Sequence, residues 1–208
     1  MNIYLIRHGR QNSPLCNVNV ELAKEGRRQA EFLGRRLENY HIDALYSSNL
    51  IRAVETAEIL NKYINQPHLI REDIREISFG LLEGMSNEEI DSEFAAFKRE
   101  QMLLEEDIPY PGGECGRQVF ERAMRTIEEI RTSGKSNIAV VTHGGVIRAL
   151  VSGLLGLDMS KKLLLGASLE NTSITQLVYY NDSKRFYLQR FNDYAHLESE
   201  EGLLRTIL

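Results

Sequence analysis

Apolar runs and helical patterns alternate along this chain. Short runs rich in β-branched and aliphatic residues, typical of buried strands, occupy residues 2–7, 42–47, 69–70 and 138–142. Apolar residues recur at helical spacing over residues 21–38, 49–64, 116–132 and 146–155, with Ser48 or Asn49 as the expected N-cap of the second helix. Residues 174–180 and 186–191 predict a closing hairpin around Asn181-Asp182. We therefore expect a three-layer α/β fold, with a mainly parallel sheet covered by helices on both faces.

Residues 75–115 interrupt this alternation. They contain Gly80 and Gly84, then an acidic helical piece over residues 87–106, and then prolines and glycines at positions 109–113. We interpret the segment as a cap or lid-like insertion over the site, within a single domain of residues 1–208. The pattern fits a solvated surface helix with long loops equally well.

Composition narrows the class of protein. The chain has 208 residues, 42% of them hydrophobic, which suits one globular domain. A formal net charge of −5 argues against nucleic acid as a partner. No apolar run approaches the roughly 20 residues of a membrane span, so we expect no membrane partner. The N-terminus enters a strand at once and has no signal-peptide pattern, which favours a cytoplasmic location.

The cysteines and several histidines do not predict a metal site. Cys16 and Cys115 are far apart and lack metal-type spacing, so we interpret them as reduced thiols. His41, His68 and His196 stand in polar or chain-end settings without partner spacing. We expect neither a metal nor an organic cofactor.

Two predicted strands end at a histidine followed by glycine. The first is Arg7-His8-Gly9 and the second is Thr142-His143-Gly144-Gly145. Ligands of α/β proteins collect at the carboxyl ends of strands, so both histidines are expected to face one point. A neutral imidazole is a competent nucleophile toward phosphorus, and Arg7 would neutralise phosphoryl oxygens. A single strand-end histidine, however, more often makes a structural hydrogen bond.

Three further features point to an anion. Arg52 stands in the first turn of a predicted helix, where the helix dipole favours anions, so a cation there makes sense beside a bound anion. The glycines after His143 open a helix whose free N–H groups suit phosphate. Glu76 lies in a partly apolar loop, and loss of water favours the protonated form of a carboxyl group, as a general acid requires. Taken singly, Arg52 is equally consistent with an exposed surface arginine, and a surface position is the commoner outcome for any single Glu in this acidic chain.

In combination these stretches resemble the histidine phosphatase superfamily of phosphoglycerate mutase-like enzymes, in its phosphatase branch. The motifs run in the family's order over most of the chain: Leu5-Ile6-Arg7-His8-Gly9, Tyr46-Ser47-Ser48 with Arg52-Ala53, Arg75-Glu76-Ile77, Pro111-Gly112-Gly113-Glu114 and Val141-Thr142-His143-Gly144-Gly145.

The resemblance implies a phosphomonoesterase that acts on a small phosphorylated metabolite without metal or cofactor. His8 would be the nucleophile, Glu76 the proton donor and His143 a further catalytic group. The phosphate pocket would comprise Arg7, Arg52, His143, Gly144, Gln11 and Asn12. The family often has an acidic or amide residue, then Thr or Ser, then Asn after its Arg-His-Gly. Here residues 10–14 depart from that pattern, so the choice among Gln11, Asn12 and Ser13 stays open, and Arg10 hints at an anionic substrate.

Other functions on the same fold remain as alternatives. One is a cofactor-dependent phosphoglycerate mutase-type phosphotransferase, and another is a non-catalytic protein that binds a phosphorylated ligand. The apolar residues Leu203-Leu204 and Ile207-Leu208 are expected to dock either on the body of the protein or on a second subunit of a homodimer.

Overall fold

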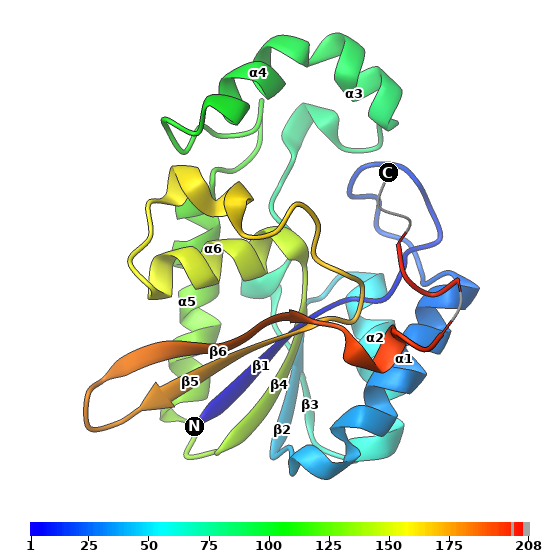
Figure 1. The fold of residues 1–208 in the computed structure, drawn as a ribbon, viewed down its shortest axis with the longest axis vertical. Coiled ribbons are helices and arrows are strands. Elements are labelled where there is room, and N and C mark those ends of the chain that lie inside the picture. Colours follow the sequence, from blue (N-terminus) through cyan, green and yellow to red (C-terminus); the bar gives the residue numbers. More distant parts are fainter. Residues whose placement is uncertain (201, 206–208) are drawn as a thin grey trace.

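Within residues 1–200 and 202–205, which the computed structural model describes, six strands form one sheet in the order β3-β2-β4-β1-β5-β6 (Figure 1). Their bounds are β1 Asn2–Arg7, β2 Ala44–Ser47, β3 His68–Ile70, β4 Asn137–Thr142, β5 Ile174–Tyr180 and β6 Arg185–Asp193. The first four strands are parallel, whereas β5 runs antiparallel to β1 and β6. The prediction of a mainly parallel sheet is confirmed, with the hairpin as its antiparallel edge.

Two pairs of helices cover the two faces of the sheet (Figure 1). Helices α1 (Lys24–Leu37) and α2 (Ile51–Ile64) lie on one face, and α5 (Gly116–Thr132) and α6 (Gly144–Leu154) on the other. The remaining helices are α3 (Asn87–Glu93) and α4 (Ala95–Leu103), with short 3-10 helices at Glu38–Tyr40, Glu72–Ile74, Gly80–Leu82, Met159–Leu164 and Ala195–Leu197.

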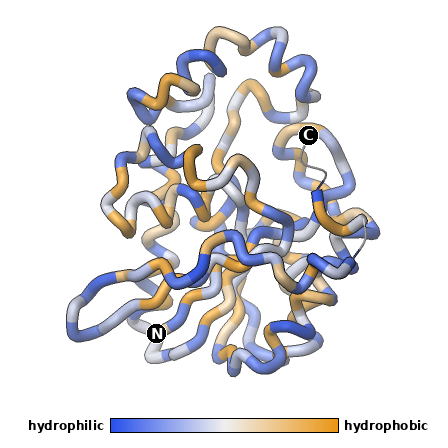
Figure 2. Tube along the Cα trace, in the orientation of Figure 1, coloured by the Kyte–Doolittle hydropathy of each residue, from blue (hydrophilic) through white to orange (hydrophobic). Residues whose placement is uncertain are grey.

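The alternation of side chains along the strands builds two cores. Ile3 and Leu5 of β1 enter the core beneath α5 and α6, while Tyr4 and Ile6 enter the core beneath α1 and α2. The sheet therefore has apolar side chains on both faces, and Figure 2 shows the strands as a hydrophobic centre. Burial on both faces holds the carboxyl end of β1 in place.

Three helix starts differ from the sequence prediction. Helix α1 begins at Lys24 rather than residue 21, since Leu22 pairs with Gln11 in an isolated β-bridge. Helix α2 begins at Ile51, and its N-cap is Leu50, so the expected caps Ser48 and Asn49 are wrong. Helix α6 begins at Gly144, two residues earlier than expected.

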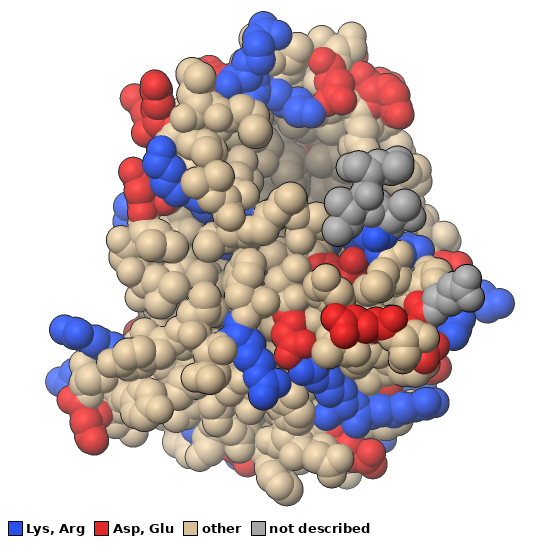
Figure 3. Space-filling model, viewed as in Figure 1, with Lys and Arg blue, Asp and Glu red and all other residues tan. Residues whose placement is uncertain are grey.

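Residues 75–115 contain two short helices, α3 and α4, where the sequence suggested one. Ser86 and Glu89 form a capping box at the start of α3, and Phe94 separates it from α4. Figure 1 shows this pair standing apart from the sheet and its four covering helices, and Figure 3 shows a hollow in the surface beneath it. The segment therefore stands over a concave part of the molecule.

The C-terminal residues described by the structure return to the body of the protein. Leu203 is 1% exposed, and its carbonyl accepts a hydrogen bond of 2.7 Å from Gln29 Nε2. Leu203 thus docks on the body of the protein, the first of the two expectations for this segment. Ile207 and Leu208 lie outside the described residues. None of the described helices combines the length and the apolar character that crossing a bilayer requires.

Candidate active site

The two strand-end histidines meet at the carboxyl edge of the sheet. Strands β1 and β4 are parallel neighbours, with Arg7 in register with Thr142, so the next residues, His8 and His143, lie side by side. Their ring centroids are 5.0 Å apart. Both side chains are buried, His8 at 4% and His143 at 0% exposure. The predicted convergence of the two histidines is therefore present in the structure.

The hydrogen bonds of His8 define which of its ring nitrogens carries the proton. Its Nδ1 lies 2.7 Å from the carbonyl oxygen of Gly9, which only accepts, so Nδ1 carries the proton. Arg52 Nε donates to Nε2 at 3.2 Å, consistent with a lone pair on that nitrogen. Burial lowers the pKa of His8 well below its usual value, and the charges of Arg52 and Arg7 lower it further. His8 is thus a neutral imidazole whose Nε2 carries the lone pair.

Arg52 is 1% exposed although it carries a full charge. Besides His8, its guanidinium donates to the Val18 carbonyl at 3.0 Å and to Asn17 Oδ1 at 2.7 Å. Burial lowers the pKa of Arg52, and the nearby Glu76 carboxylate opposes that shift. These bonds orient a cation directly beside His8 Nε2.

His143 occupies the N-cap position of α6 and has one nitrogen to spare. Its Nε2 lies 2.8 Å from Ser48 Oγ, while the buried Nδ1 has no partner among the described residues. Burial lowers the pKa of His143 well below its usual value, with Arg52 as the next cause. A bound phosphoryl group would offset this shift, because its negative charge favours the protonated ring.

Arg7 approaches the same point from the end of β1. One of its terminal nitrogens donates to the Leu169 carbonyl, and its buried Nε has no partner among the described residues. Burial and the neighbouring Arg205 lower the pKa of Arg7 to about 9, which leaves the guanidinium charged at neutral pH. A Cβ on Gly144 would lie 3.9 Å from Arg7 Nε, so the start of α6 is next to this cation. An anion here meets both the arginine and the free N–H groups of the helix.

Glu76 is bound to the same helix start. Its Oε1 accepts hydrogen bonds from the backbone nitrogens of Ile77 at 2.8 Å and Gly145 at 3.1 Å. Its Oε2 has only a longer contact of 3.4 Å with Gly145, so this oxygen is the one available to a proton. A Cβ on residue 145 would lie 2.5 Å from Oε1, so glycine is required for this approach.

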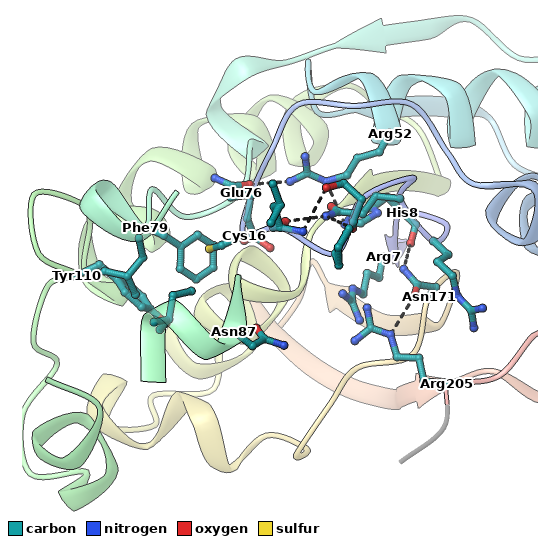
Figure 4. A pocket seen from close by; sticks show the side chains of 18 of the residues that line it. Arg7, His8, Cys16, Arg52, Glu76, Phe79, Asn87, Tyr110, Asn171 and Arg205 are labelled. Carbon is teal, nitrogen blue, oxygen red and sulfur yellow. Dashed lines mark hydrogen bonds between the residues drawn. The ribbon is translucent and has the colours of Figure 1, made fainter. Parts of the chain in front are cut away.

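These side chains open into a cavity of about 500 Å³ (Figure 4). Arg7, His8, Arg52 and Glu76 line its base, and the 11–17 loop, α3 and α4 line its sides. The residues of these two helices that line the cavity are Asn87, Ile90, Phe97, Lys98 and Gln101. The volume is that of a pocket for a small molecule.

The structure separates the three candidates in the 11–13 loop. Gln11 and Ser13 line the cavity, but the Gln11 amide is bonded to the carbonyls of Ser13 and Leu15, so it braces the loop. Asn12 is exposed, does not line the cavity and donates to Glu21 on the outer side. The structure therefore does not bring Asn12 together with the other predicted phosphate-binding residues.

Asn17 is a site residue that the sequence analysis missed. It accepts from Arg52, as described above, and its amide nitrogen donates to Glu83 at 3.1 Å. It adopts a left-handed φ of 47°, which asparagine tolerates better than most residues. The asparagine that the family has after its Arg-His-Gly could have pointed to Asn17. Residues 10–14 depart from the family's pattern, so the position matching that asparagine could not be identified from the sequence.

Asn171 is a second missed residue. It is fully buried, and its amide nitrogen donates to the His8 carbonyl at 2.8 Å. No sequence motif predicts Asn171. Its role depends on the loop that precedes β5, and Asn171 is 163 positions from His8 in the sequence.

Cys16 lines the cavity without a reactive thiolate. Burial raises the pKa of its thiol to about 11, and Glu83 adds to the shift. Within residues 1–200 and 202–205, no group of three or more His, Cys, Asp or Glu side chains is arranged to hold a metal ion.

Comparison with known proteins decides the family. The model of the histidine phosphatase superfamily (branch 1) matches residues 3–193. The chain belongs to the histidine phosphatase superfamily. This histidine phosphatase is 29% identical over 208 residues to phosphoserine phosphatase 1 of Hydrogenobacter thermophilus, covering 95% of this chain and 94% of that protein.

Further relatives of this histidine phosphatase agree with the assignment. A metal-independent phosphoserine phosphatase of Arabidopsis thaliana is 32% identical over 215 residues, covering 98% of this chain and 86% of the relative. A solved mycobacterial glucosyl-3-phosphoglycerate phosphatase in complex with inorganic phosphate has a TM-score of 0.84 at 26% identity, over 94% of this chain and 98% of that one. The fold and the family are thus supported by both sequence and structure.

Proposed function

We propose that this protein is a metal-independent phosphomonoesterase that cleaves a small phosphorylated metabolite through a phosphohistidine on His8. The observation that carries the proposal is the hydrogen bonding of His8, which holds Nδ1 protonated on Gly9 and leaves Nε2 with a lone pair in the cavity. The names of the relatives support phosphatase chemistry.

In the first step, His8 Nε2 attacks the phosphorus atom of the ester. A P–N bond forms, the ester P–O bond breaks, and the leaving oxygen takes a proton from Glu76. Arg7, Arg52 and His143 neutralise the phosphoryl oxygens during the transfer, which is the largest electrostatic requirement of such a step. The arginines supply fixed, forked cations for this purpose.

In the second step, water attacks the phosphorus atom of phospho-His8. Glu76, now ionised, accepts a proton from that water, the P–N bond breaks, and inorganic phosphate leaves. In the mutase-type alternative, a hydroxyl group of a phosphoglycerate replaces water as the acceptor. A protein that only binds a phosphorylated ligand would be expected to lack one of the catalytic groups. In this chain Arg7, His8 and Arg52 line the cavity, and His143 lies beside His8.

The test is phosphate release from p-nitrophenyl phosphate in EDTA, together with trapping of the intermediate. We expect the wild type to release phosphate and to carry an acid-labile, alkali-stable phosphoryl label. His8→Ala should lose both, with a fall in rate on the order of 10⁴-fold or more, as for removal of other enzymatic nucleophiles. His41→Asn is the control, since His41 is exposed and has a left-handed φ of 51° that asparagine tolerates.

Two outcomes would contradict the proposal. One is full activity in His8→Ala, and the other is loss of wild-type activity on addition of EDTA. Transfer of the label to 3-phosphoglycerate, dependent on a bisphosphoglycerate primer and faster than phosphate release, would instead favour the phosphotransferase.

A further inference from the structure

A second cavity adjoins the first at its base. It has a volume of about 240 Å³ and shares Arg7, Glu76, Phe79, Tyr110 and Arg205 with the larger cavity. Its other walls are the start of α6, Arg148 and the 162–168 segment. Neither His8 nor Arg52 lines it. It is therefore space beside the phosphoryl position rather than the position itself.

Arg148 faces this second cavity without a carboxylate partner. It lies one turn after Gly144 on α6 and donates to the carbonyls of Leu165 at 3.2 Å and Gly166 at 2.8 Å. Among the described residues it forms no ion pair. Burial lowers the pKa of Arg148, and the charge of Glu76 opposes that shift. Its charge is thus oriented by the loop but not neutralised by it.

Arg205 reaches the same cavity from the C-terminal segment. Its backbone nitrogen donates to Glu170 Oε2 at 3.1 Å, and its Nε donates to Asn171 Oδ1 at 3.0 Å. Figure 4 shows Arg205 beside Arg7, with Asn171 bonded both to Arg205 and to His8. Glu170 Oε1 lies 4.0 Å from Arg205 Nε. Burial lowers the pKa of Arg205, the charge of Glu170 opposes that shift, and Arg10 and Arg148 add to it.

The charges around the second cavity do not balance. Arg205 and Arg148 lower the pKa of Arg7, and Arg148 lowers that of Arg205, so the three arginines lie close together. Glu76 is the one carboxylate among the described residues that line this cavity. Lys162 also lines it but is paired with Asp107 at 2.5 Å. Like charges gathered in a partly buried site are unfavourable unless an anion joins them. A bound phosphoryl group would account for Arg7, and Glu170, which does not line the cavity, lies 4.0 Å from Arg205 Nε. Arg148 is left without an ion pair among the described residues, and Arg205 has only this long one.

We propose that Arg148 and Arg205 form a subsite for a second anionic group on the substrate, either a carboxylate or a second phosphate. This inference rests on the proposed function and specifies its substrate class: a phosphate ester of a small acid, or a bisphosphate. Both groups suit the forked donors of arginine. The loop of residues 165–171 is what brings the two side chains together, since it supplies the partners of each.

The experiment compares pairs of substrates that differ in the second group. O-phosphoserine and O-phosphoethanolamine differ by a carboxylate, and fructose 1,6-bisphosphate and fructose 6-phosphate differ by a phosphate. We expect the wild type to prefer the anionic member of one pair, measured as the ratio of kcat/KM. Arg205→Met should reduce that ratio about 10- to 100-fold, the value of a charge-assisted hydrogen bond.

Matched variants keep the result interpretable. Arg205→Lys should retain part of the preference because it keeps the charge. Arg148→Gln, which removes the charge and keeps a donor for the loop carbonyls, should reduce the same ratio. Arg35→Met removes one positive charge from the exposed side of α1 and should leave the ratio unchanged.

Failure of this inference differs from failure of the proposed function. His8-dependent hydrolysis with no preference in either pair, or a preference that persists in Arg205→Met and Arg148→Gln, would overturn the subsite alone. Absence of His8-dependent hydrolysis of every substrate would overturn the proposed function. The pair that shows the preference identifies the second group as carboxylate or phosphate.

Discussion

The floor and the cover of the larger cavity are built in opposite ways. The floor comprises Arg7, His8, Arg52 and Glu76, with His143 beside His8, and the two histidines and Arg52 are 4% exposed or less. Its side chains are tied to backbone groups and to one another by hydrogen bonds. The cover, formed by α3 and α4, contains no buried residue in either helix.

From this difference we expect the floor to determine the reaction and the cover to determine which substrate binds. The floor depends on both cores of the sheet, so a change there alters the geometry of every reaction. We expect the cover to contact the outer part of a bound molecule, so that a change there alters which molecules bind. Substitutions in the floor should therefore lower kcat/KM for all esters alike, and substitutions in the cover should act unevenly and more weakly.

Glu76→Gln tests the floor most severely after His8. Glutamine cannot donate the carboxyl proton, so we expect kcat/KM to fall about 10²- to 10⁴-fold for all esters. In the wild type, kcat/KM should be higher at acid than at alkaline pH, because a general acid must carry its proton when the ester bond breaks. The lowered pKa of His8 means that the ring stays neutral, and the nucleophile active, at acid pH. A pH–rate series from 5 to 9 on both proteins provides the measurement.

Glu72→Gln is the control, because Glu72 lies nearby, is 68% exposed and pairs only with Arg75. A wild-type rate that stays flat over this range, together with full activity of Glu76→Gln, would show that Glu76 is not the acid.

Gly145→Ala tests how closely the floor is fitted. The new methyl group would meet Glu76 Oε1 at 2.5 Å and Ile77 at 2.7 Å, so the carboxyl group must move. We expect a fall in kcat on the order of 10- to 100-fold, since small displacements of a catalytic group are costly. Ser152→Ala on the same helix is the control, because the buried Ser152 hydroxyl has no partner among the described residues. Equal kinetics in Gly145→Ala and Ser152→Ala would show that the close approach of Glu76 to residue 145 does not matter for the rate.

Phe97→Ala tests the cover and should have the smallest effect. Phe97 lines the cavity from α4, with its ring centroid 5.3 Å from that of Tyr110. We expect KM to rise about 3- to 10-fold for large esters, from loss of apolar contact, and kcat to change little. Met102→Ala, on the same helix but 69% exposed and outside the cavity, should match the wild type. A uniform fall in kcat would mean that the cover takes part in the chemistry.

The sequence predicted the floor better than the surroundings for a physical reason. His8 and His143 follow parallel buried strands, so the sheet itself determines where they lie. Arg52 and Glu76 were singled out from a helix start and a partly apolar loop, and the resemblance implied their roles. The geometry places Arg52 on His8 and Glu76 on Gly145, two residues after His143. Asn12 was included because its residue type fitted, but loop register is set by contacts such as the Gln11 bridge to Leu22, which no local pattern reveals.

Residues positioned only by tertiary contacts could not be predicted. Asn171 and Arg205 belong to no motif, and each depends on a loop that returns from another part of the chain. The N-cap of α2 was missed for the same reason, because Asn19, 32 positions away, accepts the hydrogen bond from Ile51. The motion of residues 75–115 as a lid remains a prediction.

The position of β1 between β4 and β5 has a consequence for folding. The contact that joins His8 to His143 closes a loop of about 135 residues, and such closures carry a large entropic cost and form late. No shorter piece of the chain contains both histidines. Phosphatase activity should therefore return after dilution from denaturant only when the whole sheet has formed. The rate at which activity returns would then report the rate of the last folding step.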